Sequence, residues 1–190
     1  MSLVRSGFAP RPPVPFPVDG SATVHRIAVL LLLFLVLHTL LEWPALDRPL
    51  FALNAATADA AIAWLALAGV PLLREGTMVI HAQGFVTEVH QVCTALLPAA
   101  LLAVGIAMHP HGSAPDKLVG VLLGVLVVAL VNQCRLVGVI WVGVQASQWF
   151  SAVHEWLAPA WLVALTTAYG WAWTRTVSPK VSRWNPSRHP

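Results

Sequence analysis

The segment Thr87-Glu-Val-His-Gln-Val-Cys-Thr-Ala95 decides the fold, because a polar, strand-like stretch passes there into an apolar helix. Upstream, Thr77 to His81 and Phe85 to Val89 are rich in β-branched or aromatic residues and flank a glycine-containing turn, which predicts a small hairpin. Downstream, Val92 to Met108 is apolar and predicts a membrane-spanning helix. Open strands cannot lie in hydrocarbon, so we expect the hairpin outside the bilayer core. Cys93 therefore falls at a membrane boundary.

The composition is that of an integral membrane protein with one domain. Hydrophobic residues make up 57% of the chain and charged residues 10%, whereas a soluble domain carries about 25% charged residues. The formal charge is +3 without a basic run, which excludes a nucleic-acid partner and leaves the lipid bilayer as the main surroundings. No motif for haem, flavin or nucleotide binding is present, so no cofactor is predicted. The two cysteines have no metal-site spacing, and the close pair His109-Pro-His111 lacks a neighbouring Cys or Glu, so no metal is predicted.

Apolar segments predict an all-α polytopic fold with about four transmembrane helices. The uninterrupted part of an Ala-rich segment, Ala60 to Ala68, is too short for a core that needs about 20 residues, so residues 55–73 predict an interfacial helix, with a fifth span as the alternative. Arg74-Glu-Gly76 is interpreted as a turn, and the hairpin is extracytoplasmic. A signal peptide is the alternative for the first span. The predicted spans are Ile27 to Leu41, Val92 to Met108, Leu118 to Trp141 and Val153 to Trp173.

The two ends of the chain predict the orientation. Residues 1–26 are proline-rich and basic and predict a disordered tail, residues 27–174 form the membrane domain, and residues 175–190 form a second basic tail. With four spans both tails lie on one side, which the positive-inside rule places in the cytoplasm. We therefore expect a multi-pass protein of the cytoplasmic (inner) membrane, with Cys93 facing outward.

Three chemically capable residues share one predicted depth. Cys93, Arg135 and His154 each lie roughly 24–28 Å of helix from the inner end of their spans, near the outer side of a core of about 30 Å. A thiolate nucleophile is favoured at a helix N-terminus and beside cations. Arg135 is suited to oxyanion or carboxylate binding and His154 to acid–base catalysis. Asn132, one turn before Arg135, would support either partner.

Each of these residues has a structural alternative. Cys93 would be a small core residue, Arg135 an arginine that extends to the interface, His154 an interfacial histidine and Asn132 a helix-packing residue. A disulfide between Cys93 and Cys134 would make the constellation structural. Glu88 and His90, which precede Cys93, line either a substrate groove or a plain strand surface.

At these residues the sequence resembles the exosortase/archaeosortase family over about residues 50–173. The resemblance rests on Gly69-Val-Pro71, the hairpin into Cys93, Asn132-x-x-Arg135 and His154. The family usually shows Cys-Ser-Gly or Cys-Asn-Gly at its nucleophile, where this chain has Cys93-Thr-Ala95.

The resemblance implies a membrane cysteine endopeptidase or transpeptidase that processes C-terminal sorting tails. It assigns Cys93 as nucleophile, Arg135 as stabilising cation and His154 as acid/base. The substrate would be a secreted protein with a short motif, a transmembrane helix and a basic end. The alternatives are a non-catalytic assembly or scaffold subunit of an envelope or polysaccharide system and a small anion transporter.

Overall fold

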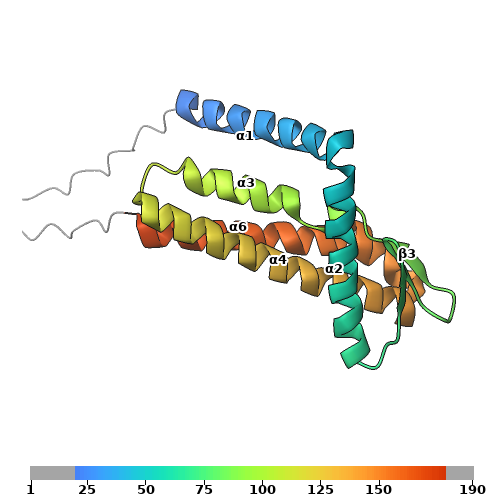
Figure 1. Cartoon of the computed structure of the whole chain (residues 1–190). Coiled ribbons are helices and arrows are strands. Elements are labelled where there is room, and N and C mark those ends of the chain that lie inside the picture. Colours follow the sequence, from blue (N-terminus) through green and yellow to red (C-terminus); the bar gives the residue numbers. More distant parts are fainter. Residues whose placement is uncertain (1–19, 179–190) are drawn as a thin grey trace, which may run out of the picture.

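The computed structural model describes residues 20–178, which form a mostly helical protein (Figure 1). Helices α3 (Leu96–Ala107), α4 (Ala114–Gln145) and α6 (Ala158–Val177) contact one another and form a bundle. The predicted helical class is confirmed. Most of the two predicted tails, residues 1–19 and 179–190, lies outside the described residues.

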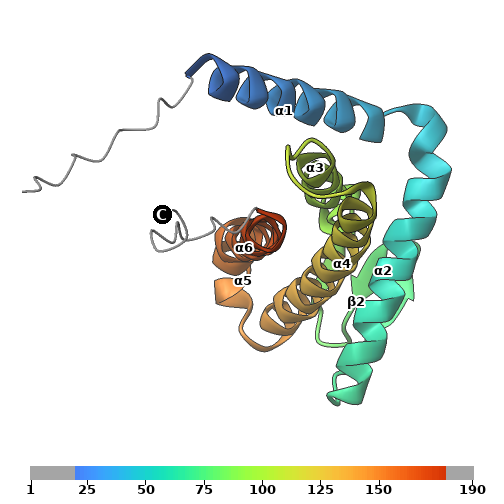
Figure 2. The same cartoon turned by 90° about the vertical axis from the view of Figure 1, so that its left-hand side faces the viewer.

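Helix α1 (Gly20–Leu41) starts earlier than the predicted Ile27, so the prediction of disorder for residues 20–26 is wrong. It contacts α3 and crosses over it in Figure 2. The helix stops before Pro44, because a proline disfavours helical backbone in the residue before it, and Trp43 is extended (φ −75°, ψ 127°). The turn η1 (Pro44–Leu46) then redirects the chain into the next helix.

Helix α2 (Asp47–Leu67) lies across the long axis of the bundle in both views (Figures 1 and 2). Ala58, Ala61 and Leu65 recur at helical spacing on its buried face and share a core cluster with Leu136 and Ile140 of α4. Because two of these side chains are alanines, the two backbones approach closely. This crosswise direction is the one that an interfacial helix takes beside upright spans.

Among residues 20–178, length and composition identify two helices that can cross a membrane, Pro44–Leu67 and Ala114–Gln145. The second contains the predicted span 118–141. The first includes most of the segment predicted to lie at the interface. Its length would allow it to span a membrane, but its direction differs from that of the bundle. Two further apolar helices, Ile27–Leu41 and Leu96–Ala107, are shorter, and the predicted total of four spans remains a prediction.

A three-stranded antiparallel sheet precedes α3, in the order β1 (Leu73–Glu75), β2 (Met78–Ile80) and β3 (Val86–Glu88). The predicted hairpin is confirmed in β2 and β3. Strand β1 corrects the interpretation of residues 74–76 as a turn. The turn lies at Gly76, whose φ of +63° suits glycine, and Arg74 pairs with Asp59 of α2, which holds the added strand in place.

Candidate active site

Cys93 ends a separate 3₁₀ turn, η2 (Gln91–Cys93), ahead of α3. The prediction that it lies in the first turn of a helix starting at Val92 is therefore wrong. Its backbone N–H donates to the carbonyl of His90 at 2.8 Å. The side chain is 4% exposed and belongs to the core cluster that includes Leu136 and Ile140.

The backbone turns sharply between Cys93 and α3. Ala95 has φ 56° and ψ 21°, and it is the one non-glycine residue with positive φ among residues 20–178. Left-handed backbone costs an L-residue about 1–2 kcal/mol, so surrounding contacts must hold Ala95 in place. Its side chain is buried with Val128 and Leu162, which supply those contacts. Strain of this kind two residues after a cysteine is typical of a site whose geometry matters.

Asn132 of α4 joins the cysteine turn to Arg135. Its side-chain Nδ2 donates to the backbone carbonyl of Cys93 at 2.6 Å, and its Oδ1 accepts from Arg135 Nη1 at 3.1 Å. Asn132 is 2% exposed, so both bonds are made in a buried environment. The supporting role predicted for Asn132 thus has a defined geometry: one amide fixes the backbone of Cys93 and the head group of Arg135.

Arg135 keeps donor capacity free after this contact. Its Nε is buried and has no hydrogen-bond acceptor, and it forms no ion pair within the described part of the chain. A buried donor without an acceptor is rare and calls for an explanation. A carbonyl or carboxylate oxygen of a bound molecule would satisfy it.

His154 lies on a π-helical turn, η4 (Val153–Leu157), directly before α6. Such turns are frequent at functional sites. Its ring stacks on Phe150 with centroids 5.3 Å apart and an interplanar angle of 11°, and Phe150 meets Phe85 edge to face at 5.3 Å. Phe85 packs against the core cluster that contains Cys93.

The aromatic pair of Phe85 and Phe150 packs directly against Gly143 of α4. A Cβ there would come within 2.2 Å of Phe85 and 2.9 Å of Phe150, so only glycine fits. The segment that carries His154 and the sheet lie at the same end of the bundle (Figure 1). Between residues 20 and 178 no hydrogen bond links His154 to Cys93 or Arg135, and Phe150 and Phe85 connect His154 to the core cluster that contains Cys93.

The remaining predicted residues take simpler places. Glu88 accepts from Thr77 Oγ1 at 3.0 Å and pairs with His90 at 3.3 Å, with both side chains about half exposed. Glu88 ends β3, and His90 lies between β3 and the turn that carries Cys93; both side chains are at the surface. Cys134 is exposed and both cysteines are free, so the alternative of a disulfide with Cys93 is wrong.

A cavity that was not predicted from the sequence lies beside the cysteine turn. This space of about 170 Å³ is lined by Gln91, Val92 and Ala95 on one side and, on the other, by His38 of α1 and by Glu42, which directly follows α1. His38 and Glu42 pair at 3.4 Å. Two polar residues one turn apart in a dense apolar helix were the available signal, since ionisable residues in such segments are costly and often functional.

The site contains a buried cysteine, an arginine with a free buried donor, and the Asn132 amide that bonds the cysteine backbone and the arginine head group. This donor set fits acyl transfer, in which a thiolate attacks a carbonyl and a cation binds the resulting oxyanion. The ring of His154 is held in place by its stacking on Phe150.

No curated protein and no solved structure matches the chain. The family model described as transmembrane exosortase (Exosortase_EpsH) matches residues 20–177, which include the sheet, Cys93, Asn132, Arg135 and His154. The chain therefore belongs to the transmembrane exosortase family.

Proposed function

We propose that the protein is a membrane-embedded cysteine endopeptidase or transpeptidase that processes C-terminal sorting signals of secreted proteins. The observation that carries this proposal is the Asn132 bridge from the Cys93 carbonyl to Arg135, whose buried Nε has no acceptor in residues 20–178. Membership of the exosortase family supports the same activity.

In the proposed reaction the Cys93 thiolate attacks the carbonyl carbon of the scissile peptide bond. Arg135 donates to the oxyanion that forms, and Asn132 holds Arg135 and the backbone of Cys93 in fixed positions relative to each other. The tetrahedral intermediate collapses, the carbon–nitrogen bond breaks, and His154 gives the leaving amine the proton that it took from the Cys93 thiol. The resulting thioester passes its acyl group to water or to an amine, which restores the thiol.

The proposed placement puts this site at the outer face of the cytoplasmic membrane. The membrane domain covers residues 27–174, both termini lie in the cytoplasm, and α2 rests at the outer interface. The crosswise direction of α2 and its position at the sheet-bearing end of the bundle support an interfacial position for α2 beside the sheet (Figure 1). The substrate is a secreted protein that ends in a short motif, an apolar helix and a basic segment.

The test is co-expression with a tail-bearing secreted protein from the same source. We expect Cys93→Ala, Arg135→Ala and His154→Ala to abolish or strongly reduce processing at normal membrane levels, because each removes one chemical role. Cys134→Ser is the matched control, since it removes the exposed thiol and leaves the site intact. Unchanged processing by the Cys93→Ala variant would refute the proposed enzymatic function.

A second candidate is a non-catalytic assembly subunit of an envelope system. The observation that favours it is the burial of Cys93, which is 4% exposed and packed in a hydrophobic cluster. In that function Asn132 and Arg135 join elements and Cys93 fills space. The Cys93→Ala variant distinguishes the two functions. A scaffold would keep its assembly phenotype, whereas an enzyme would lose its processed product.

A further inference from the structure

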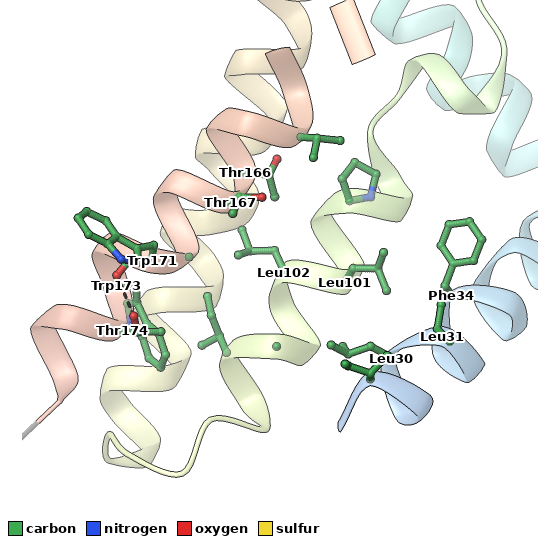
Figure 3. A pocket seen from close by; sticks show the side chains of 16 residues that line it. Leu30, Leu31, Phe34, Leu101, Leu102, Thr166, Thr167, Trp171, Trp173 and Thr174 are labelled. Carbon is green, nitrogen blue, oxygen red and sulfur yellow. Dashed lines mark hydrogen bonds between the residues drawn. The ribbon is translucent and has the colours of Figure 1, made fainter. Parts of the chain in front are cut away.

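An apolar groove of about 710 Å³ runs between α1, α3 and α6, apart from the residues of the active site (Figure 3). Its floor is α3, and its two walls are α1 and α6. Leucines and a phenylalanine of α1 face threonines of α6 across two leucines of α3. These side chains are Leu30, Leu31, Phe34, Leu101, Leu102, Thr166 and Thr167.

The α6 wall has the surface of a helix-packing site. Thr166, Gly170 and Thr174 line the groove at every fourth residue, so they form one row along the helix. In membranes, rows of small residues with hydroxyl groups are typical of surfaces on which a second helix packs closely.

One of these hydroxyl groups lacks a partner. Thr166 Oγ1 is buried and makes no hydrogen bond within residues 20–178. A lipid chain has no group to satisfy it, whereas a helix offers polar side chains. The floor is also open at Gly105, where a Cβ would meet no atom within 4 Å. The groove therefore has the shape and chemistry to take a helix.

The groove leads to the cysteine turn. Pro98 lines both this groove and the smaller cavity of about 170 Å³ beside Gln91, Val92 and Ala95. Along α1 the lining changes from apolar residues such as Phe34 to the His38–Glu42 pair at the cavity. A polypeptide lying in the groove would pass from apolar to polar surroundings as it approached Cys93.

We propose that the groove between α1, α3 and α6 docks the apolar C-terminal helix of the substrate. The polar segment that precedes this helix enters the cavity beside the cysteine turn, which brings a peptide bond to the residues that flank Cys93. This inference rests on the proposed function, which supplies a substrate with an apolar helix next to the cleaved motif.

The direct test is photo-crosslinking in the Cys93→Ala background, which retains substrate. A photoreactive amino acid replaces Leu101 in the groove or, as the control, Leu126, which is 54% exposed on α4 and does not line the groove. The probe is a secreted reporter that carries the tail. We expect an adduct with the reporter from position 101 and none from position 126. An adduct with a second copy, or no protein adduct, would overturn the docking site.

A kinetic test uses two glycines with matched surroundings. Gly105 lies in the groove and Gly138 on α4 outside it, and a Cβ at either meets no atom within 4 Å, so both leucine variants are expected to fold. We expect Gly105→Leu to slow reporter processing about tenfold, which corresponds to about 1.4 kcal/mol of lost docking. Gly138→Leu should stay within about twofold of wild type.

The outcomes separate this inference from the proposed function. If the wild-type chain does not process the reporter, or if Cys93→Ala still does, the proposed function fails. If Cys93 is required and Gly105→Leu processes as fast as Gly138→Leu, the enzyme stands and the groove is not its docking site.

Discussion

Replacing Asn132 by leucine tests the bridge on which the active site depends. The change keeps a side chain of similar size and removes both hydrogen bonds, so the Cys93 carbonyl loses its donor and Arg135 Nη1 loses its acceptor. Asn132 is 2% exposed, so water cannot readily replace either partner. At about 1–3 kcal/mol for each unsatisfied group, the expected loss of stability is about 2–6 kcal/mol. Values from membrane proteins place the result toward the lower end.

The matched control is the next residue on the same helix. Gln133 Nε2 donates to the carbonyl of Thr57 at 3.3 Å, a longer bond that ties α4 to α2 without touching Cys93. Gln133→Leu should therefore cost about 1 kcal/mol and leave processing unchanged. Asn132→Asp is the second variant: it keeps the contact with Arg135 but sets a carboxylate against the Cys93 carbonyl, so it should also lose activity.

The assay is unfolding of the purified protein in mixed micelles with increasing SDS, followed by the fluorescence of its nine tryptophans. Processing of a tail-bearing reporter is measured in parallel. Equal unfolding midpoints and equal processing for Asn132→Leu and Gln133→Leu would show that the bridge does not position the site, and the reasoning would fail.

The remaining predictions concern the cysteines, the strained residue and the aromatic support. A small membrane-permeant maleimide should label the exposed Cys134 rapidly and the buried Cys93 slowly, so that Cys134→Ser removes the fast phase; equal rates would contradict the burial of Cys93. Ala95→Gly should change stability by less than about 1 kcal/mol, because relief of about 1–2 kcal/mol of left-handed strain offsets about 0.8 kcal/mol for the lost methyl group and the greater freedom of unfolded glycine. A larger loss of stability in an unfolding titration would show that packing of the Ala95 methyl group outweighs the strain in its backbone. Gly143→Ala should displace the aromatic pair, lower processing and destabilise by about 1–3 kcal/mol, whereas Gly138→Ala should be neutral or slightly stabilising. Equal processing by these two variants would disconnect the pair from catalysis.

Periodic and local signals in the sequence predicted much of the fold. The hairpin of β2 and β3 follows from its alternating β-branched residues, and the contact between Asn132 and Arg135 follows from their spacing of one helical turn. Strand β1 was missed because Arg74 and Glu75 are charged and precede a glycine, a pattern that also describes a turn. Pairing with β2 and the contact of Arg74 with Asp59 come from distant parts of the chain, which no local pattern reveals.

Two features of the site depend on backbone geometry that side-chain patterns do not encode. Nothing in an alanine at position 95 signals a left-handed residue, so the helix was predicted to run continuously from Val92. The π-helical turn at His154 likewise leaves the apolar pattern almost unchanged while it rotates the residues that follow. The usual glycine two residues after the family's cysteine is the signal that was available, because glycine adopts the backbone conformation that Ala95 has here.

Asn132 binds the residue at position 93 through its main-chain carbonyl oxygen. Any amino acid placed there presents the same carbonyl group, so the position of the residue is independent of its chemistry. A serine or an alanine at position 93 would therefore occupy the geometry of the nucleophile and change only its reactivity. A Cys93→Ala or Cys93→Ser variant is thus suited to trap a substrate, because it lacks the reactive thiol and keeps the arrangement that receives the substrate.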